Sequence, residues 1–299
     1  MKSLDGNALT ALADLFLPRL CCVCGSELGR NERHVCIDCL ADMPLTLNWT
    51  LRRNPMAERF NALIERNGSV EDGEDDAEEA VNGGNAEAGE GPDNAAADMF
   101  ERYVDAVALF NFVKDGGYRH ITYKLKYGGD IGEGRHFSAM LGERAALAPW
   151  LSDVDTVIPV PLHWTRRLKR GYNQAEVIAS EVAKALGARL RTDILVRRRR
   201  TSTQTRLGVE DKARNVRGAF SLSRAVLKHS GHSPMGPLTP AGRWRRTRTG
   251  ATDSIAGIRH ILIVDDVFTT GSTLYNCFIP LRKFFGPEVR ISIATLGVV

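Results

Sequence analysis

The sequence predicts an α/β fold, with a mainly parallel sheet flanked by helices and a small four-cysteine module ahead of it. The sheet is predicted by residues 261–264, Ile-Leu-Ile-Val, a continuously apolar run that is too short for a helix and typical of a central parallel strand. A loop rich in hydroxyl groups then leads into residues 274–285, whose apolar side chains recur at helical spacing. The module is predicted by five cysteines within residues 21–39.

The chain has 299 residues, of which 43% are hydrophobic, and this is enough apolar material for one sizeable core and a smaller module. It contains no apolar run of about 18 residues, so we expect no insertion into a membrane. Residues 9–16 show helical apolar spacing, but Asp5 and Asp14 interrupt any signal-peptide core, and we expect a short amphipathic helix. The clustered cysteines do not suit a disulfide framework across a chain this long, which predicts a reducing, cytoplasmic location.

Charge is distributed unevenly along the chain. Residues 67–98 contain eleven acidic residues and no basic or aromatic ones, so they cannot bury enough surface to offset the entropy lost on ordering. We therefore predict an N-terminal helix and cysteine module in residues 1–60, an acidic disordered linker in 61–98, and an α/β domain in 99–299. Within the last part, residues 223–254 are rich in Pro, Gly, Ser and Arg, which predicts a flexible insertion.

The body of the protein is strongly basic once the acidic segment is set apart. The whole chain has a formal net charge of +4, and the chain without residues 67–98 carries about +15. Such a surface suits phosphate-rich partners. We interpret the acidic segment as a solvated spacer; the alternative is that it folds back onto the basic surface and screens it.

The cysteine module has the spacing of a metal site. Cys21 and Cys24 form one CxxC pair, and Cys36 and Cys39 form a second after eleven intervening residues. Two such pairs let four thiolates converge tetrahedrally on one Zn²⁺, and four thiolates leave no open position for water, so we predict a structural zinc ion. Cys22 in place of Cys21, and His34 in place of one cysteine, are the alternatives that the spacing leaves open.

Two aspartates and a group of hydroxyls follow the predicted strand. Asp265 and Asp266 fall at its carboxyl end, where open α/β sheets place their ligands. Residues 269–273, Thr-Thr-Gly-Ser-Thr, offer hydroxyls and backbone N–H groups at the start of a helix, which favours an anion. Carboxylates only accept hydrogen bonds, so they suit a ribose diol or a hydrated Mg²⁺. The pattern predicts one site for a sugar diol and its 5′-phosphate, against the alternative of an ordinary turn and helix cap.

Residues 261–273 resemble the phosphoribosyl pyrophosphate (PRPP) motif of type I phosphoribosyltransferases: an apolar strand, two acidic residues and a TTGxT-like loop. The segments at 120–130, 154–187 and 200–220, taken with the cysteine module, are together similar to the ComF family of phosphoribosyltransferase-like proteins. The match covers residues 15–43 and 105–299. The fold that this resemblance implies is a type I phosphoribosyltransferase-like sheet with an N-terminal zinc module.

The resemblance assigns roles to three groups of residues. It implies that ribose and 5′-phosphate are bound by Asp265, Asp266, Thr269, Thr270, Gly271, Ser272 and Thr273. It implies that pyrophosphate, with Mg²⁺, faces Arg167, Lys169, Arg170 and Gly171, for which a basic surface loop is the alternative. It also implies a mobile flap that excludes water from the reacting centre and contains Thr201, Gln204, Arg206, Arg214 and Asn215.

Two functions of different classes follow from the resemblance. The first is an Mg²⁺-dependent phosphoribosyltransferase that binds PRPP or a nucleotide-like ligand, with an acceptor that the sequence does not name. The second is a non-catalytic module for single-stranded DNA and for DNA-processing or uptake proteins, because the ComF family is associated with natural competence. Basic clusters at 197–200 and 243–248 would contact phosphates, and Trp164 and Trp244 would stack on bases.

An acceptor base would need a hood, and the sequence offers one candidate region before residue 130. Its aromatic and basic side chains are Tyr118, Tyr123, Lys124, Lys126 and Tyr127. They suit stacking on a base, but the same segment also fits a half-buried helix with solvated lysines. Both interpretations stay open at the level of sequence.

Overall fold

The computed structural model describes residues 18–71, 103–112, 116–128, 131–198, 218–229, 255 and 257–299. The predicted helix at residues 9–16, residues 72–98 of the predicted linker and residues 230–254 of the predicted insertion lie outside this set. No described helix is long and apolar enough to cross a membrane.

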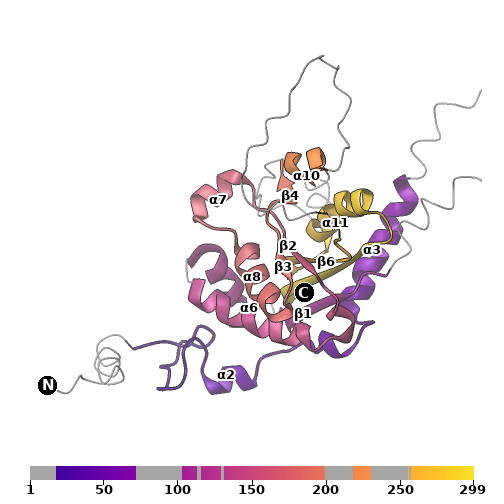
Figure 1. The fold of residues 1–299 in the computed structure, drawn as a ribbon. Helices are drawn as coiled ribbons and strands as arrows, with labels where there is room; N and C mark the ends of the chain where they lie inside the picture. The colour runs from indigo at the N-terminus through magenta and orange to yellow at the C-terminus, as the bar shows by residue number, and fades with distance from the viewer. Residues whose placement is uncertain are drawn as a thin grey trace, which may run out of the picture.

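The described chain forms an α/β fold around a five-stranded sheet (Figure 1). Its strands are β1 (Ala106–Asn111), β2 (Thr156–Pro159), β3 (Arg189–Leu190), β6 (His260–Phe268) and β7 (Arg290–Val298). They lie in the order β1-β7-β6-β2-β3, and every neighbouring pair is parallel. A separate antiparallel pair joins β4 (Leu195–Arg197) to β5 (Phe220–Leu222).

Helices cover both faces of the sheet. They comprise α2 (Ile37–Ala41), α3 (Pro55–Glu71), α5 (Arg119–Tyr123), α6 (Ile131–Ala146), α7 (Trp164–Arg170), α8 (Gln174–Leu186), α10 (Arg224–His229) and α11 (Ser272–Phe285), with the short turns η1 (Asn48–Thr50), η2 (Lys124–Gly128) and η3 (Pro149–Leu151). Helices α3 and α11 pack on one face of the sheet, and α6 and α8 pack on the other. The two layers confirm the predicted fold class.

Strand β6 shows why the apolar run belongs in the middle of such a sheet. Successive side chains of a strand point to opposite faces. Ile261 and Ile263 accordingly lie in the core below α3 and α11, whereas Leu262 and Val264 lie in the core below α6 and α8. All four are fully buried, so a continuous apolar run is what this position requires.

Helix α3 begins before the predicted linker and extends into it. Asn54 accepts a hydrogen bond from Ala57 N–H at 3.0 Å, and Pro55 occupies the first helical turn, where its missing N–H costs nothing. Phe60 and Ile64, one turn apart, are buried against the sheet. Helix α3 thus includes residues 61–71 of the segment predicted as linker, and burial of its apolar face at Phe60 and Ile64 stabilises it.

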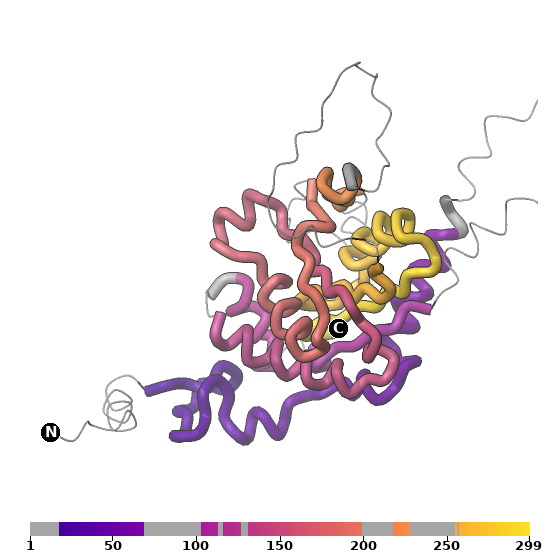
Figure 2. Tube along the Cα trace, viewed as in Figure 1, coloured from indigo at the N-terminus to yellow at the C-terminus, as the bar shows by residue number. Residues whose placement is uncertain are grey.

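The cysteine module packs against the same body rather than apart from it. Its buried residues share a core with α6 and β1. Residues 44–46 cover the open edge of β1: Thr46 N–H donates to Leu109 O at 3.1 Å, and Asn111 N–H donates to Pro44 O at 2.7 Å. Figure 2 shows this N-terminal segment in indigo, running along the side of the body below α6 and continuing to α3.

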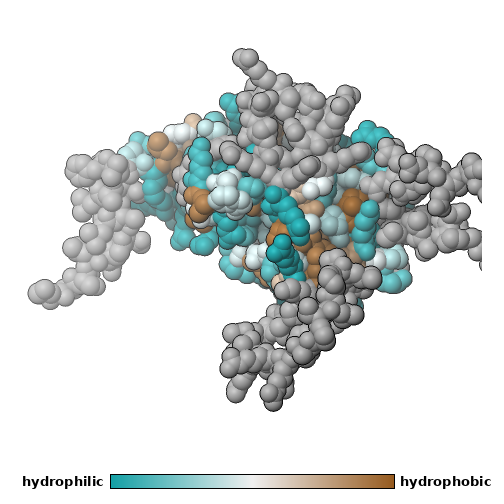
Figure 3. Space-filling model, turned by 90° about the horizontal axis from the view of Figure 1, so that it is seen from above, coloured by the Kyte–Doolittle hydropathy of each residue, from teal (hydrophilic) through white to brown (hydrophobic). Residues whose placement is uncertain are grey.

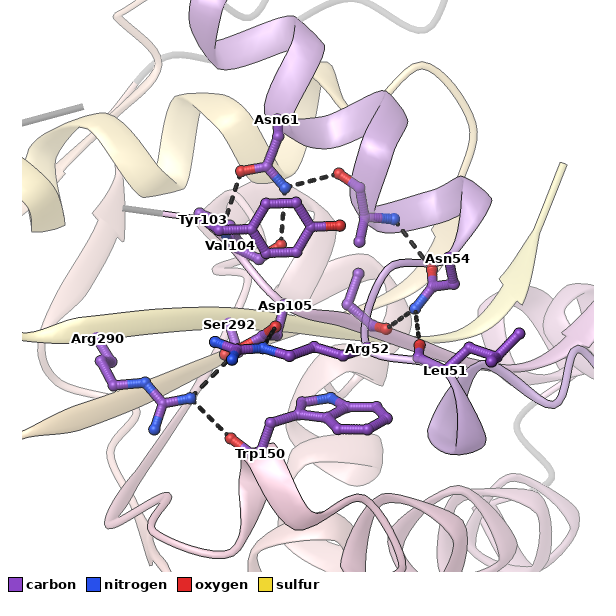
Figure 4. A network of polar contacts seen from close by, with 12 residues as sticks. Leu51, Arg52, Asn54, Asn61, Tyr103, Val104, Asp105, Trp150, Arg290 and Ser292 are labelled. Carbon is purple, nitrogen blue, oxygen red and sulfur yellow. Dashed lines mark hydrogen bonds and ion pairs between the residues drawn. The ribbon is translucent and has the colours of Figure 1, made fainter. Parts of the chain in front are cut away.

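A polar network fixes the junction between the module and the sheet (Figure 4). Asp105, only 1% exposed, directly precedes β1 and has two cationic partners. Arg52 Nε lies 2.8 Å from its Oδ1, and Arg290 Nη2 lies 3.3 Å from its Oδ2. The same Arg290 guanidinium donates to Trp150 O at 2.9 Å. One carboxylate thus connects the segment before α3 to the start of β7.

We predict that Asp105→Ala lowers the free energy of unfolding by about 2–3 kcal/mol, because it removes a buried carboxylate that pairs with both Arg52 and Arg290 and connects the segment before α3 to β7. Urea denaturation measures the change. Asp193→Ala is the matched control, since Asp193 is exposed and also pairs with one arginine through both oxygens. The control should cost less than about 1 kcal/mol. Equal losses in both variants would contradict the role given to Asp105.

Candidate functional site at the carboxyl ends of β2 and β6

The candidate site lies where two neighbouring strands send the chain in opposite directions. From β2 the chain passes through α8 to β3 on one side, and from β6 it passes through α11 to β7 on the other. Helices α8 and α11 pack on opposite faces of the sheet. Such a reversal leaves a crevice at the carboxyl ends of the two strands, and ligands of open α/β sheets bind there.

Strand β6 is longer than the sequence predicts. Its pairing with β7 continues to Phe268, whereas its pairing with β2 ends at Pro159↔Val264. Asp265 and Asp266 therefore lie inside β6, not after it, because β7 supplies backbone partners that the apolar run alone does not reveal. They begin where β2 leaves the sheet, which places them at the crevice.

The two aspartates face different layers of the molecule. Because side chains alternate along a strand, Asp265 points toward the α11 side and Asp266 toward the α6 side. Asp266 is 6% exposed, and its N–H donates to Asp265 Oδ1 at 2.9 Å. Each carboxylate consequently meets a different cation.

Lys126 is the partner of Asp266. Its Nζ lies 2.8 Å from Asp266 Oδ2. Burial alone would lower the pKa of Lys126, but the charges of Asp266 and Asp265 outweigh it and raise that pKa. At the level of sequence, Lys126 was either part of a hood over a base or a solvated lysine of a half-buried helix. The structure instead pairs it with Asp266.

The turn that carries Lys126 is η2, a single π-helical turn, a form that occurs often at functional sites. Three contacts hold it. Leu125 packs where Gly134 has no side chain, since a Cβ there would lie 2.3 Å from Leu125 Cδ1. Tyr172 Oη donates to Leu125 O at 2.5 Å, and Lys124 Nζ lies 3.2 Å from Glu133 Oε2. Lys126 is thus held in place through contacts of the two residues that precede it.

Asp265 has an unusually high pKa. Burial and the adjacent charge of Asp266 raise it to about 7, although Lys126 and Arg197 act in the opposite direction. Arg197 comes from β4, and its guanidinium lies 5.0 Å from the centre of the Phe220 ring. Burial and the nearby Arg166 lower the pKa of Arg197. Asp265 therefore titrates near neutral pH in the absence of ligand.

The hydroxyl loop connects β6 to α11. Thr269 and Thr270 are exposed, and Ser272 and Thr273 are partly buried in the first turn of α11. Thr270 Oγ1 lies 2.9 Å from Ser272 Oγ. The N-cap residue of α11 is Gly271, which has no side chain to cap the helix, and Thr270 Oγ1 accepts from Ser272 N–H at 3.4 Å. The N–H groups that follow in the first turn of this 14-residue helix suit an anion.

Gly271 is required by both conformation and space. Its φ of 77° lies in the left-handed region that residues with a Cβ avoid. A Cβ at this position would lie 3.0 Å from the Phe268 ring and 3.2 Å from Leu63. The glycine of the predicted motif thus lets the chain turn tightly over α3.

The predicted pyrophosphate residues lie on a short helix, α7, rather than on a loop. His163 caps it, with Thr165 N–H at 3.4 Å from Nδ1, and Gly171 ends it with φ 80°. Arg167 Nη1 lies 3.0 Å from Glu176 Oε1, so this side chain points to the first turn of α8. Arg170 is close enough to Lys126 to lower its pKa. Lys169 also lies in the last turn of α7.

The predicted flap residues Thr201, Gln204, Arg206, Arg214 and Asn215 all lie outside the described residues. The structure does describe the two strands from which that segment departs. Arg197 pairs with Phe220 across β4 and β5, and this stem thereby carries a cation whose charge acts on Asp265.

Three cations of the site were not assigned to it from the sequence: Lys126, Arg197 and Arg59. Arg59, on α3, donates to the carbonyl oxygen of Thr269 at 2.6 Å. Arg197 was assigned to a basic cluster, but its guanidinium is buried beside Phe220. Each of these residues reaches the site from an element distant in sequence, so the local pattern held no signal for it.

A second polar chain lies at the opposite ends of the strands. His260 Nδ1 is 2.8 Å from Asp153 Oδ1, and His260 Nε2 is 2.8 Å from Ser292 Oγ. The order resembles an Asp-His-Ser triad, yet His260 is 0% and Ser292 1% exposed, so no substrate reaches the hydroxyl. We interpret this chain as a buried structural network.

The four predicted cysteine ligands converge. The Sγ atoms of Cys21, Cys24, Cys36 and Cys39 all lie within 4.8 Å of one another. Cys24 Sγ and Cys36 Sγ are 3.7 Å apart, close to the edge of about 3.8 Å expected for a tetrahedron with metal–sulfur bonds of about 2.3 Å. The cluster is close enough to hold a metal ion.

Backbone geometry supports the cluster. Cys36 N–H points to Cys21 Sγ at 3.3 Å, and Cys39 N–H points to Cys36 Sγ at 3.4 Å. Hydrogen bonds from Ser26 lower the pKa of Cys24 to about 6. These contacts favour thiolates, which are the form that binds metal.

Neither alternative ligand joins the cluster. Burial and the charge of Glu133 raise the pKa of Cys22 to about 12, and its thiol is hydrogen-bonded to that carboxylate. The His34 ring lies 5.5 Å from the His136 ring, centre to centre. Among the described residues, it is Cys21 that clusters with Cys24, Cys36 and Cys39.

Comparison with known proteins finds relatives that match part of this chain. The chain is 31% identical over 137 residues to "Competence protein F" of Haemophilus influenzae, which covers 46% of this chain and 48% of that protein. It is 30% identical over 120 residues to "DNA utilization protein YhgH" of Escherichia coli O6:H1, covering 40% of each. Both relatives agree with the resemblance to the ComF family that the sequence motifs show.

This agreement rests on part of each relative. The chain spans less than half the length of the curated relatives that it matches. No family model matches it. The parallel sheet and the four-cysteine cluster agree with the expectations that the ComF resemblance raised.

The raised pKa of Asp265 predicts a pH-dependent stability. An aspartate with a raised pKa binds more protons in the folded state, so the free energy of unfolding falls as pH rises from its ordinary pKa to about 7. We expect Asp265→Asn to remove this fall, gaining about 2 kcal/mol over the wild type between pH 5.5 and 8. Urea midpoints at the two pH values measure it.

Asp193→Asn is the control for this measurement. Hydrogen bonding to Arg191 lowers the pKa of Asp193, so its contribution to stability is lost only at more acidic pH. The control should therefore follow the wild type between pH 5.5 and 8. Parallel curves for Asp265→Asn and the wild type would contradict a raised pKa.

Proposed function

We propose that the protein binds PRPP, or a related ribose phosphate, with Mg²⁺ at the carboxyl ends of β2 and β6, and that it acts in DNA uptake or DNA processing as a ComF-like phosphoribosyltransferase-fold protein. One observation supports the ligand: Asp266, which is buried, and its partly buried neighbour Asp265 lie beside a helix N-terminus whose N-cap residue is a glycine, at the reversal point of the sheet. The acceptor of any ribosyl transfer is left unassigned.

Different residues of the site would bind the different parts of PRPP. Asp265 and Asp266 accept hydrogen bonds from ribose hydroxyls. The N–H groups and hydroxyls of residues 269–273 donate to the 5′-phosphate. Arg170, on the α7 side of the crevice, faces the pyrophosphate end together with Lys169. Breaking the C1′ bond increases negative charge on pyrophosphate, so fixed cations there stabilise the transition state more than the ground state.

The carboxylates also fit a divalent cation, because oxygen ligands are those that Mg²⁺ prefers. Bound with PRPP, Mg²⁺ supplies charge neutralisation of the pyrophosphate. Lys126 pairs with Asp266, with Nζ 2.8 Å from Oδ2. The ribose end of the ligand is thus recognised beside a cation that the chain itself provides.

The association with DNA follows from the names of the relatives, "Competence protein F" and "DNA utilization protein YhgH". A second candidate function, binding of single-stranded DNA, is favoured by α7. Trp164 is 64% and Leu168 75% exposed on this helix, which also carries four cationic side chains. Where the described surface is visible from above, hydrophilic residues alternate with separate hydrophobic patches (Figure 3). Exposed aromatics stack on bases while cations contact phosphates.

We also propose that the cysteine cluster holds one structural Zn²⁺. A site of four thiolates has no open position for chemistry, and the ion would hold the two halves of the module together.

We predict one Zn²⁺ per chain by elemental analysis of the purified protein, and loss of that ion in Cys36→Ser, since three thiolates leave the site incomplete. Cys22→Ser is the matched control, because Cys22 faces Glu133 and should leave the zinc content unchanged. A zinc-free wild-type protein with a folded module would contradict the proposal.

Asp265→Asn combined with Asp266→Asn should weaken PRPP binding at least about tenfold, because two charged acceptors for the ribose hydroxyls are lost. Calorimetric titration with and without Mg²⁺ measures it, with thermal unfolding to confirm the fold and Asp193→Asn as control. Unchanged PRPP affinity in a folded double variant would exclude the site.

The salt dependence and the Mg²⁺ dependence of binding, measured on the same purified protein, distinguish the two candidate functions. DNA held through several phosphates releases counterions, so its affinity should fall steeply with salt. A PRPP site bridged by Mg²⁺ should depend on Mg²⁺ instead. An oligonucleotide that binds in a salt-dependent way, without any PRPP binding, would favour the second candidate alone.

A further inference from the structure

Arg59 contacts the hydroxyl loop from an element that precedes the acidic segment. Its Nη2 donates to Thr269 O at 2.6 Å, across 210 positions of sequence, and its Nη1 donates to the backbone oxygen of Val299. Its guanidinium lies 5.3 Å from the centre of the Phe268 ring. One side chain of α3 thus holds both the exit of β6 and the end of β7.

Helix α3 forms a platform under this loop. Phe60 contacts Phe268 edge to face, with ring centres 6.3 Å apart. Leu63 and Phe268 leave Gly271 no room for a Cβ. The loop is therefore packed against α3 on one side, and its other side is exposed at Thr269 and Thr270.

The hydrogen bond to Thr269 O fixes the orientation of a neighbouring donor. All described peptide bonds are trans, so the carbonyl of Thr269 and the N–H of Thr270 point in opposite directions across one rigid plane. Because the carbonyl points to Arg59 on α3, the Thr270 N–H points away from α3. That is the side where an anion meets the first turn of α11.

We propose that Arg59 is a positioning residue for the 5′-phosphate: it fixes the peptide plane between Thr269 and Thr270 so that the Thr270 N–H donates to a bound phosphate monoester. This inference rests on the proposed function of the site. Without Arg59 the peptide plane can rotate, and a rotated plane would present a carbonyl oxygen to the anion. An N–H donor that is already oriented needs no reorganisation when the anion binds. Losing that orientation therefore lowers the affinity for the anion.

The test is calorimetric titration with ribose 5-phosphate and with PRPP, both of which carry the 5′-phosphate. Arg59→Met keeps the length and the apolar packing of the side chain but removes its donors. We expect both ligands to bind at least about tenfold more weakly to this variant, and by the same factor. Arg59→Lys keeps a charged donor and should restore part of the affinity.

Arg66→Met is the matched control, since Arg66 is exposed on the same helix two turns further along. It should bind both ligands as the wild type does. Thermal unfolding identifies any variant that has lost its fold, and Arg59→Lys then provides the comparison in place of Arg59→Met.

Two results would overturn the inference and are distinguishable. If the wild type binds ribose 5-phosphate and a folded Arg59→Met variant binds it equally well, Arg59 has no positioning role although the site stands. If the wild type binds neither ligand, the proposed function fails and the inference fails with it.

Discussion

Two adjacent carboxylates in a sheet strand set the constraint on which the site depends. Burial in low dielectric disfavours charge, and the repulsion between neighbours adds to that cost. Alternation along β6 sends Asp265 and Asp266 to opposite layers, so compensation must come from both. Lys126 arrives from the α6 side and Arg197 from the β4–β5 stem. The strand thus requires support from two distant segments in order to hold its charge.

The cysteine module contributes to this support through a short chain of contacts. Cys22, inside the module, is hydrogen-bonded to Glu133, and Glu133 pairs with Lys124 in the turn that carries Lys126. Tyr118 also donates to Cys39 O at 2.7 Å. A metal that orders the module would therefore also order the turn η2, which carries Lys126. The proposed structural zinc would in this way support the candidate site without contacting it.

The layer that contains α3 and α11 supports the loop that is proposed to bind the 5′-phosphate. Helix α3 places Phe60, Leu63 and Arg59 beneath the loop that follows β6. Segments on both sides of the acidic stretch thus contribute to one crevice: Lys126 and Arg59 approach β6 from opposite layers. The part of the chain before the sheet domain is consequently part of the site.

The sequence by itself determined the features whose cause is local. An apolar run of four residues predicts a buried strand, and CxxC spacing predicts convergent thiols; the structure has both. It did not determine where β6 ends, because β7 supplies the pairing. It also could not show that Lys126, Arg197 and Arg59 meet at β6. Those contacts join residues far apart in sequence, and only the packing of helices on both faces of the sheet brings their charges together.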